Sequence, residues 1–118
     1  MRSYDLSLEI SEIAPGKGKK VLAAIEGTGN QWDWESGALE LHTKDRTLSA
    51  NGRGSLFAGQ TEEEHTEQLA RLIWKANRGP CLVHTRWINL DEGLNVEFGP
   101  ADYQRVMEGG DDRQDPED

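Results

Sequence analysis

The sequence predicts an α+β domain, in which a mostly antiparallel sheet of about five or six strands carries one main helix, residues 61–78, packed across it. Two observations predict this class. Several segments alternate apolar and polar residues with a period of two, which is typical of strands with one buried face. One further segment instead repeats apolar residues at helical spacing between residues that start and stop helices.

The helix predicted over residues 61–78 has a start, an apolar stripe and an end that can be read from the sequence. Thr61 and Glu64 have the spacing of a capping box. Acidic residues crowd the first turns and basic residues the last, which complements the helix dipole. Gly79 offers a left-handed residue past the end, and Pro80 prevents continuation. The stripe expected to face the sheet consists of Leu69, Leu72, Ile73 and Ala76.

The strands before this helix are predicted from alternation. Residues 4–11 alternate most regularly and form the first expected strand. Residues 20–26 fit either a returning strand or a short helix, and the flanking glycines leave too few residues for a stable isolated helix, so we favour a β-hairpin. The other strands expected here are 38–43 and 47–50, and the loops or turns expected are 27–37 and 51–54.

After the helix, residues 81–90 are rich in β-formers on both faces, as expected for an inner strand. Residues 94–98 alternate and form its expected hairpin partner. Pro100 then opens a short helical turn. We therefore predict one α+β domain over residues 1–107 and an acidic disordered tail over residues 108–118.

Charge and composition exclude several classes of protein. The chain has 118 residues and a net charge of −9, of which the tail contributes −5. Because there is no basic stripe, we expect no direct nucleic-acid binding. The single cysteine excludes an intrachain disulfide framework and fits a reducing compartment. With no apolar run of membrane-spanning length and no signal-peptide pattern, we expect a cytoplasmic protein that contacts no membrane.

The sequence predicts no catalytic residues, no metal site and no cofactor. Cys81 and His84 form a single C-x-x-H, but residues three apart on a strand face opposite sides, and zinc sites need two ligand pairs. Ser55 and Cys81 are conceivable nucleophiles with His42 or His84 as base, yet no nucleophile elbow is present. We therefore expect that the protein is not an enzyme.

The four tryptophans are the candidate partner-binding residues: Trp74, Trp32, Trp34 and Trp87. Trp74 lies roughly 140° around the helix from Leu69, away from the stripe centre, and tryptophan is over-represented in interface hot spots. The alternative is that the loop carrying Trp32 and Trp34 folds over Trp74 as a satellite cluster. The same two interpretations apply to Trp87.

Residues 54–81 read G-S-L-F-A-G-Q-T-E-E-E-H-T-E-Q-L-A-R-L-I-W-K-A-N-R-G-P-C. This stretch, about a quarter of the chain, resembles one found in small uncharacterised proteins of bacteriophages, prophages and mobile elements, and the likeness continues loosely to Asp102 and Tyr103. The resemblance implies an origin but no activity, and it assigns no functional residues. Small acidic phage proteins outside the virion often bind and block host machinery, as anti-CRISPR and antirestriction proteins do.

The function expected from these observations is non-enzymatic binding of a host protein by a phage- or mobile-element-encoded protein, with inhibition of a defence system as the effect. One alternative is a phage structural or assembly accessory that binds phage proteins and forms homo-oligomers through an exposed sheet edge. The other is a small metal-binding protein or enzyme.

Overall fold

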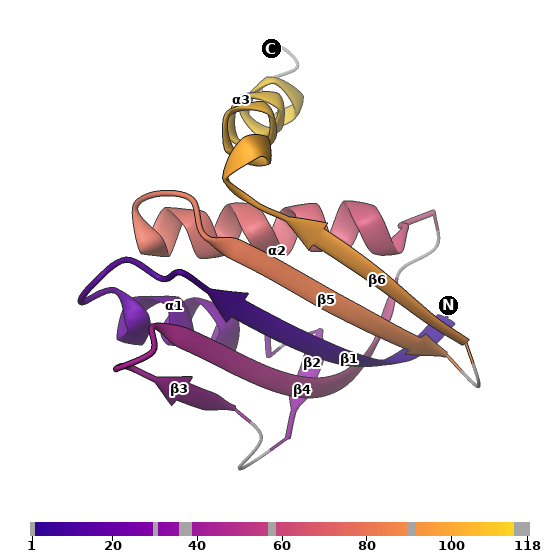
Figure 1. The fold of residues 1–118 in the computed structure, drawn as a ribbon. Coiled ribbons are helices and arrows are strands. Elements are labelled where there is room, and N and C mark those ends of the chain that lie inside the picture. Colours follow the sequence, from indigo (N-terminus) through magenta and orange to yellow (C-terminus); the bar gives the residue numbers. More distant parts are fainter. Residues whose placement is uncertain (1, 30, 36–38, 57–58, 90–91, 115–118) are drawn as a thin grey trace.

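The computed structural model describes residues 2–29, 31–35, 39–56, 59–89 and 92–114. These residues form one six-stranded antiparallel sheet with helices packed on one of its faces (Figure 1). The α+β class is therefore confirmed. The expectation of a single main helix is too simple, because three α-helices are present.

Strands and helices are interspersed along the chain, and all six strands belong to one sheet. The sheet order is β2-β4-β1-β5-β6, and the short β3 also pairs with β4. The elements are β1 (Arg2–Ser11), α1 (Gly18–Glu26), β2 (Trp32–Trp34), β3 (Glu40–His42), β4 (Thr47–Leu56), α2 (Glu62–Asn77), β5 (Leu82–Asn89), β6 (Glu92–Phe98), η1 (Pro100–Asp102) and α3 (Tyr103–Gln114).

The strand predicted over residues 4–11 is confirmed as β1, the central strand of the sheet. It pairs with β4 on one side and β5 on the other. Its alternation has the expected consequence, since the apolar set is buried and the residues between face the other side. The buried residues are Tyr4, Leu6, Leu8 and Ile10.

The turn expected over residues 51–54 and the loop expected over residues 27–37 are both wrong in part. Residues 51–54 continue β4, and β2 lies within the expected loop. Gly52 and Gly54 pair with Trp34 and Trp32 of β2. A Cβ atom at Gly52 would lie 2.7 Å from Trp34 Cε3, and one at Gly54 would lie 2.4 Å from Trp32 Cε3. These glycines make room for indole rings on the neighbouring strand.

The β-hairpin favoured for residues 20–26 is also wrong, because these residues belong to α1. The helix has only nine residues, and Val21 and Ile25, four residues apart, are its buried positions. Both belong to the common hydrophobic core, and α1 packs beside α2. Tertiary packing of this apolar side stabilises a helix that would be marginal alone.

The capping box predicted for α2 is present. The backbone N–H of Glu64 donates to Thr61 Oγ1, and the backbone N–H of Thr61 donates to Glu64 Oε1, both at 3.1 Å. At the other end, the left-handed residue is Arg78, with a φ of 61°, rather than the expected Gly79.

We expect Thr61→Ala to lower the free energy of unfolding by about 1 kcal/mol, because it removes the acceptor of the Glu64 amide. Thermal or urea denaturation measures this loss. Thr61→Ser keeps a hydroxyl at the same position and serves as the control, and an equal loss in both variants would contradict the role of the cap.

The buried stripe of α2 is rotated from its predicted position. Leu69 and Ile73 are buried as expected, but Leu72 is 39% exposed while Trp74 is 0% exposed. Trp74 therefore lies on the same buried side of α2 as Leu69, Ala70 and Ile73. The helix α3 packs beside α2 and places the ring of Tyr103 5.4 Å from the indole.

The C-terminal helical turn predicted after Pro100 is longer than expected, since η1 leads directly into the 12-residue α3. Val106 of α3 is buried in the core. The boundary expected at Glu108, between domain and tail, falls inside α3, which continues to Gln114. Among the described residues, no helix combines the length and apolar character needed to cross a membrane.

Candidate functional site

All four tryptophan indoles donate their N–H to acceptors inside the molecule. Trp32 donates to His65 Nε2 at 2.7 Å, and Trp34 to Thr28 Oγ1 at 2.9 Å. Trp74 donates to the carbonyl oxygen of Cys81 at 2.9 Å. The indole N–H of Trp87 is shared between two hydroxyls, those of Thr85 at 2.9 Å and Thr66 at 3.1 Å.

The burial of three of these rings counts against the prediction that they bind a partner, whereas for Trp34 it stays a prediction. Trp32, Trp74 and Trp87 are at most 1% exposed, and Trp34 is half-buried. A partner cannot contact the three buried rings while the fold is closed. The satellite-cluster alternative also needs correction, because Trp32 packs against Trp87, with centroids 5.4 Å apart, rather than covering Trp74.

His65 packs against the rings of both Trp32 and Trp87 and is 4% exposed. Its Nε2 accepts the Trp32 N–H, so this nitrogen carries no proton and the neutral ring bears its proton on Nδ1. Burial lowers the pKa of His65 from 6.5 to about 4, and the side chain of Gln68 opposes this shift. Within the described part of the chain, Nδ1 makes no hydrogen bond of good geometry, although Gln68 lies near the ring. His65 is a neutral core residue that gives the core a pH dependence.

Cys81, the conceivable nucleophile, is a buried thiol. Burial is the main cause that raises its pKa to about 11, with Trp74 acting in the opposite direction and Glu12 adding to the rise. A thiol with so high a pKa is protonated at neutral pH and reacts poorly. His84, three residues later, faces away from Cys81, as the strand geometry predicts.

The structure does not assemble the conceivable Ser–His pair. The Ser55 hydroxyl lies 3.4 Å from that of Ser3, at one end of β1, whereas His84 pairs with Glu9 near the other end. Among the described residues, no group of three or more His, Cys, Asp or Glu side chains could hold a metal ion.

A different surface is the strongest candidate site, namely the sheet face opposite the helices. The helices pack on the face that carries the alternating buried residues, and in the described part of the chain no helix lies on the other face (Figure 1). Polar side chains project from this uncovered face along four adjacent strands. We call it the open face, and its members include Asp5, Ser7 and Glu9 of β1, Ser49 and Arg53 of β4, His84, Arg86 and Ile88 of β5, and Asn95 and Glu97 of β6.

A hollow of about 390 Å³ lies at one end of the open face, and both His42 and His84 line it. His84 Nε2 lies 3.1 Å from Asn95 Oδ1, and its Nδ1 lies 3.9 Å from Glu9 Oε1. Glu97 completes the carboxylate lining. The side chains of Glu9 and His42 are 71% and 54% exposed, which fits a wet recognition surface better than a water-excluded catalytic site.

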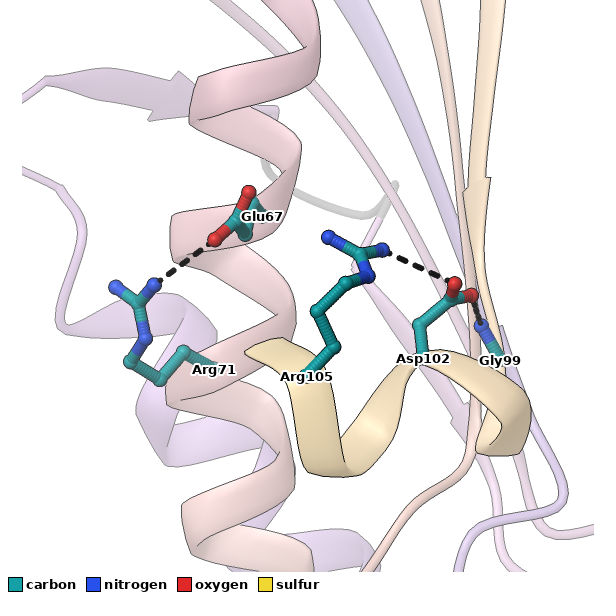
Figure 2. Close-up of polar contacts among 5 residues, drawn as sticks. All are labelled: Glu67, Arg71, Gly99, Asp102 and Arg105. Carbon is teal, nitrogen blue, oxygen red and sulfur yellow. Dashed lines mark hydrogen bonds and ion pairs between the residues drawn. The ribbon is translucent and has the colours of Figure 1, made fainter. Parts of the chain in front are cut away.

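A second polar cluster lies where α2 meets the base of α3, and it has a structural role (Figure 2). Asp102 accepts the backbone N–H of Gly99 at 3.0 Å and pairs with Arg105 at 3.1 Å. The Gly99 amide is the main cause that lowers the pKa of Asp102. Across from them, Glu67 and Arg71 form an i,i+4 pair at 3.2 Å with side chains only 16% and 11% exposed. The contacts of Asp102 cap η1, and the pair of Glu67 with Arg71 stabilises one face of α2.

The sequence contains the alternation that defines the open face, as in Asp5, Ser7 and Glu9. It contains no sign of which sheet face the helices leave uncovered, so the open face could not be chosen as a site beforehand. Comparison of the chain with protein-family models, with curated proteins and with solved structures finds no match.

Proposed function

We propose that this chain is a non-enzymatic binding protein that recognises another protein through the open face of its sheet. The observation that carries the proposal is the open face itself, a broad polar surface on an antiparallel sheet whose opposite face is covered by helices. Many antiparallel sheets have one solvated face. Here that face also carries a hollow lined by two histidines and two carboxylates, which provides shape and hydrogen-bonding groups for a partner.

The charge of the open face favours a partner with a basic surface. Asp5, Glu9 and Glu97 provide its carboxylates, and Arg53 and Arg86 its cations. Arg53 is already paired with Asp5 at 3.2 Å. The acidic groups around the hollow remain largely solvated, so they are available to steer a basic partner. The same charge disfavours a nucleic-acid backbone.

The resemblance of residues 54–81 to phage and mobile-element proteins supports a host protein as the partner. Inhibition of a host defence system is the effect that we propose for this binding. A binding role also fits the positions of the residues that could react. The thiol of Cys81 and the ring of His65 are buried, and the exposed His42 and His84 line the hollow of the open face, so these side chains do not surround one reacting centre.

We expect site-specific photo-crosslinking to reveal this surface. A photoreactive phenylalanine placed at Ser7, in the middle of the open face, should crosslink to a discrete host protein in cytoplasmic extract. The same group placed at Ala23, which is exposed on α1, should not. With the captured protein purified, the double variant Glu9→Lys/Glu97→Lys should bind it about tenfold more weakly or worse, as calorimetry would measure.

The matched control is Glu26→Lys/Glu63→Lys, which changes the net charge equally at exposed helix positions. It should keep its affinity within about twofold, because surface charges away from a contact act weakly through screening. Equal losses in both double variants, or crosslinks only from Ala23, would overturn the open face as the contact surface. A failure to capture any host protein from either position would overturn the binding function.

A further inference from the structure

A second hollow, of about 340 Å³, lies between the loop that follows β1, the first turn of α1 and the turn that joins β3 to β4. Ile13 and Leu41 give it an apolar floor, and Lys19, Lys44 and Arg46 stand on its rim. We call these five residues the basic hollow. The backbone N–H of Ile13 donates to the Arg46 carbonyl oxygen at 3.1 Å, which fastens the loop and the turn together.

The cations of the basic hollow are not used by the fold. Lys19, Lys44 and Arg46 are exposed, and none of them forms an ion pair with any residue that the structure describes. Lys17 and Lys20 stand beside them in sequence. Five of the 13 lysines and arginines therefore lie within residues 17–20 and 44–46, against one acid, Asp45, in a chain whose net charge is −9. This local excess of positive charge attracts an anion.

The start of α1 shows that these lysines oppose folding rather than assist it. The positive end of a helix dipole favours acids, yet α1 has no acid in its first turn and no side-chain cap. It carries Lys19 and Lys20 there, with Lys17 at the N-cap. In the same chain, α2 follows the rule with Glu62, Glu63 and Glu64 in its first turn. Because α1 lacks the acidic first turn that α2 has, we infer that the lysines of α1 serve binding rather than stability.

We propose that the basic hollow binds an acidic segment of a partner protein, with an apolar side chain of that segment against Ile13 and Leu41. Carboxylates on the same segment lie beside Lys19, Lys44 and Arg46, where charge complementarity is greatest. The apolar floor selects a peptide over an inorganic anion. Nucleic acid fits less well, because none of the described residues that line the hollow is an aromatic on which a base could stack. The acidic remainder of the chain also repels a long polyanion.

This contact is separate from the open face. Leu41 pairs with the buried Leu48, so the floor of the basic hollow belongs to the helix-covered side of the sheet. A partner that uses both surfaces has to reach around the edge formed by β3. The two proposals can therefore fail independently.

The test uses a fluorescein-labelled peptide of glutamates with two central leucines, followed by fluorescence anisotropy. We expect the peptide to bind, and the binding to weaken with added salt and when serines replace the leucines. Lys19→Glu/Lys44→Glu should reduce the affinity about tenfold or more. The matched control Arg53→Glu/Arg86→Glu makes the same charge change on the open face and should stay within about twofold of the parent.

Stability separates a lost site from a lost fold. Lys19→Glu places an acid in the first turn of α1, so the melting temperature should hold or rise while peptide affinity falls. Lys44→Glu alone, in the exposed turn, should also lose part of the affinity. The proposal is overturned if the peptide does not bind or if both double variants lose affinity equally. It is also overturned if inorganic phosphate or a single-stranded oligonucleotide displaces the labelled peptide as well as unlabelled peptide does. A third contrary result is a parent chain that light scattering shows to be an oligomer and a Lys19→Glu/Lys44→Glu variant that is a monomer, because the positive charges would then serve self-association.

Discussion

Gly54→Ala is expected to lower the free energy of unfolding by about 2–3 kcal/mol, although alanine is the better residue by intrinsic propensity. The added Cβ would lie 2.4 Å from Trp32 Cε3 and 2.5 Å from the carbonyl oxygen of Gln31. Real Cβ atoms do not approach other heavy atoms so closely, and the Gln31 contact is with backbone that cannot rotate away. The propensity gain of roughly 0.5–1 kcal/mol is smaller than this overpacking cost.

Urea denaturation measures the Gly54 effect, and Gly79→Ala is its control. A Cβ at Gly79 would meet no atom within 4 Å, so that variant should change stability by only about 0.5 kcal/mol or less. If Gly54→Ala proved as stable as the parent chain, Trp32 would not lie against β4, and the pairing of β2 with β4 would be incorrect.

The second large effect is a loss of stability in mild acid caused by His65. Its pKa is about 4 in the folded protein and 6.5 in the unfolded chain, so the unfolded chain binds more protons between these values. The contribution of His65 is therefore complete above pH 6.5 and is lost as the pH falls towards 4. The shift corresponds to about 3 kcal/mol.

The measurement compares the free energy of unfolding of the parent chain and of His65→Phe across this pH range. The variant should be less stable at pH 7, because Trp32 loses its acceptor, but the difference should shrink by about 2–3 kcal/mol by pH 4. Thr66→Val perturbs the same buried cluster without removing a titratable group, so its curve should run parallel to that of the parent. Parallel curves for His65→Phe as well would show that His65 is not buried in its neutral form.

The sequence predicted the elements whose pattern lies within a few neighbouring residues. The alternation of residues 4–11 was sufficient for β1, and the capping box at Thr61 located the start of α2. Gly52 and Gly54 indicated a turn, and that prediction is wrong. These positions are glycine because the indole rings of β2, more than 15 residues away in the sequence, leave no room for a Cβ atom. Similarly, α1 depends on packing against α2, which no nine-residue window contains.

The candidate sites were less predictable than the fold for the same reason. Tryptophan is common in interfaces, but Trp74 lies on the buried side of α2 and packs against Tyr103 of α3, some 30 residues further along the chain. The open face depends on which side of the sheet the helices take. The basic hollow joins two segments, each of which reads as an ordinary polar loop or turn when it is considered alone.

Three of the four tryptophans build the interior, and we propose that the open face contacts the partner. Chemical-shift mapping of the isotope-labelled protein during titration with its captured partner tests this most directly. We expect the largest amide shifts at open-face positions such as Ser7, Arg53 and Arg86, with the indole N–H signals of Trp32, Trp74 and Trp87 unchanged. Large shifts of those three indole signals, together with an unperturbed open face, would contradict it.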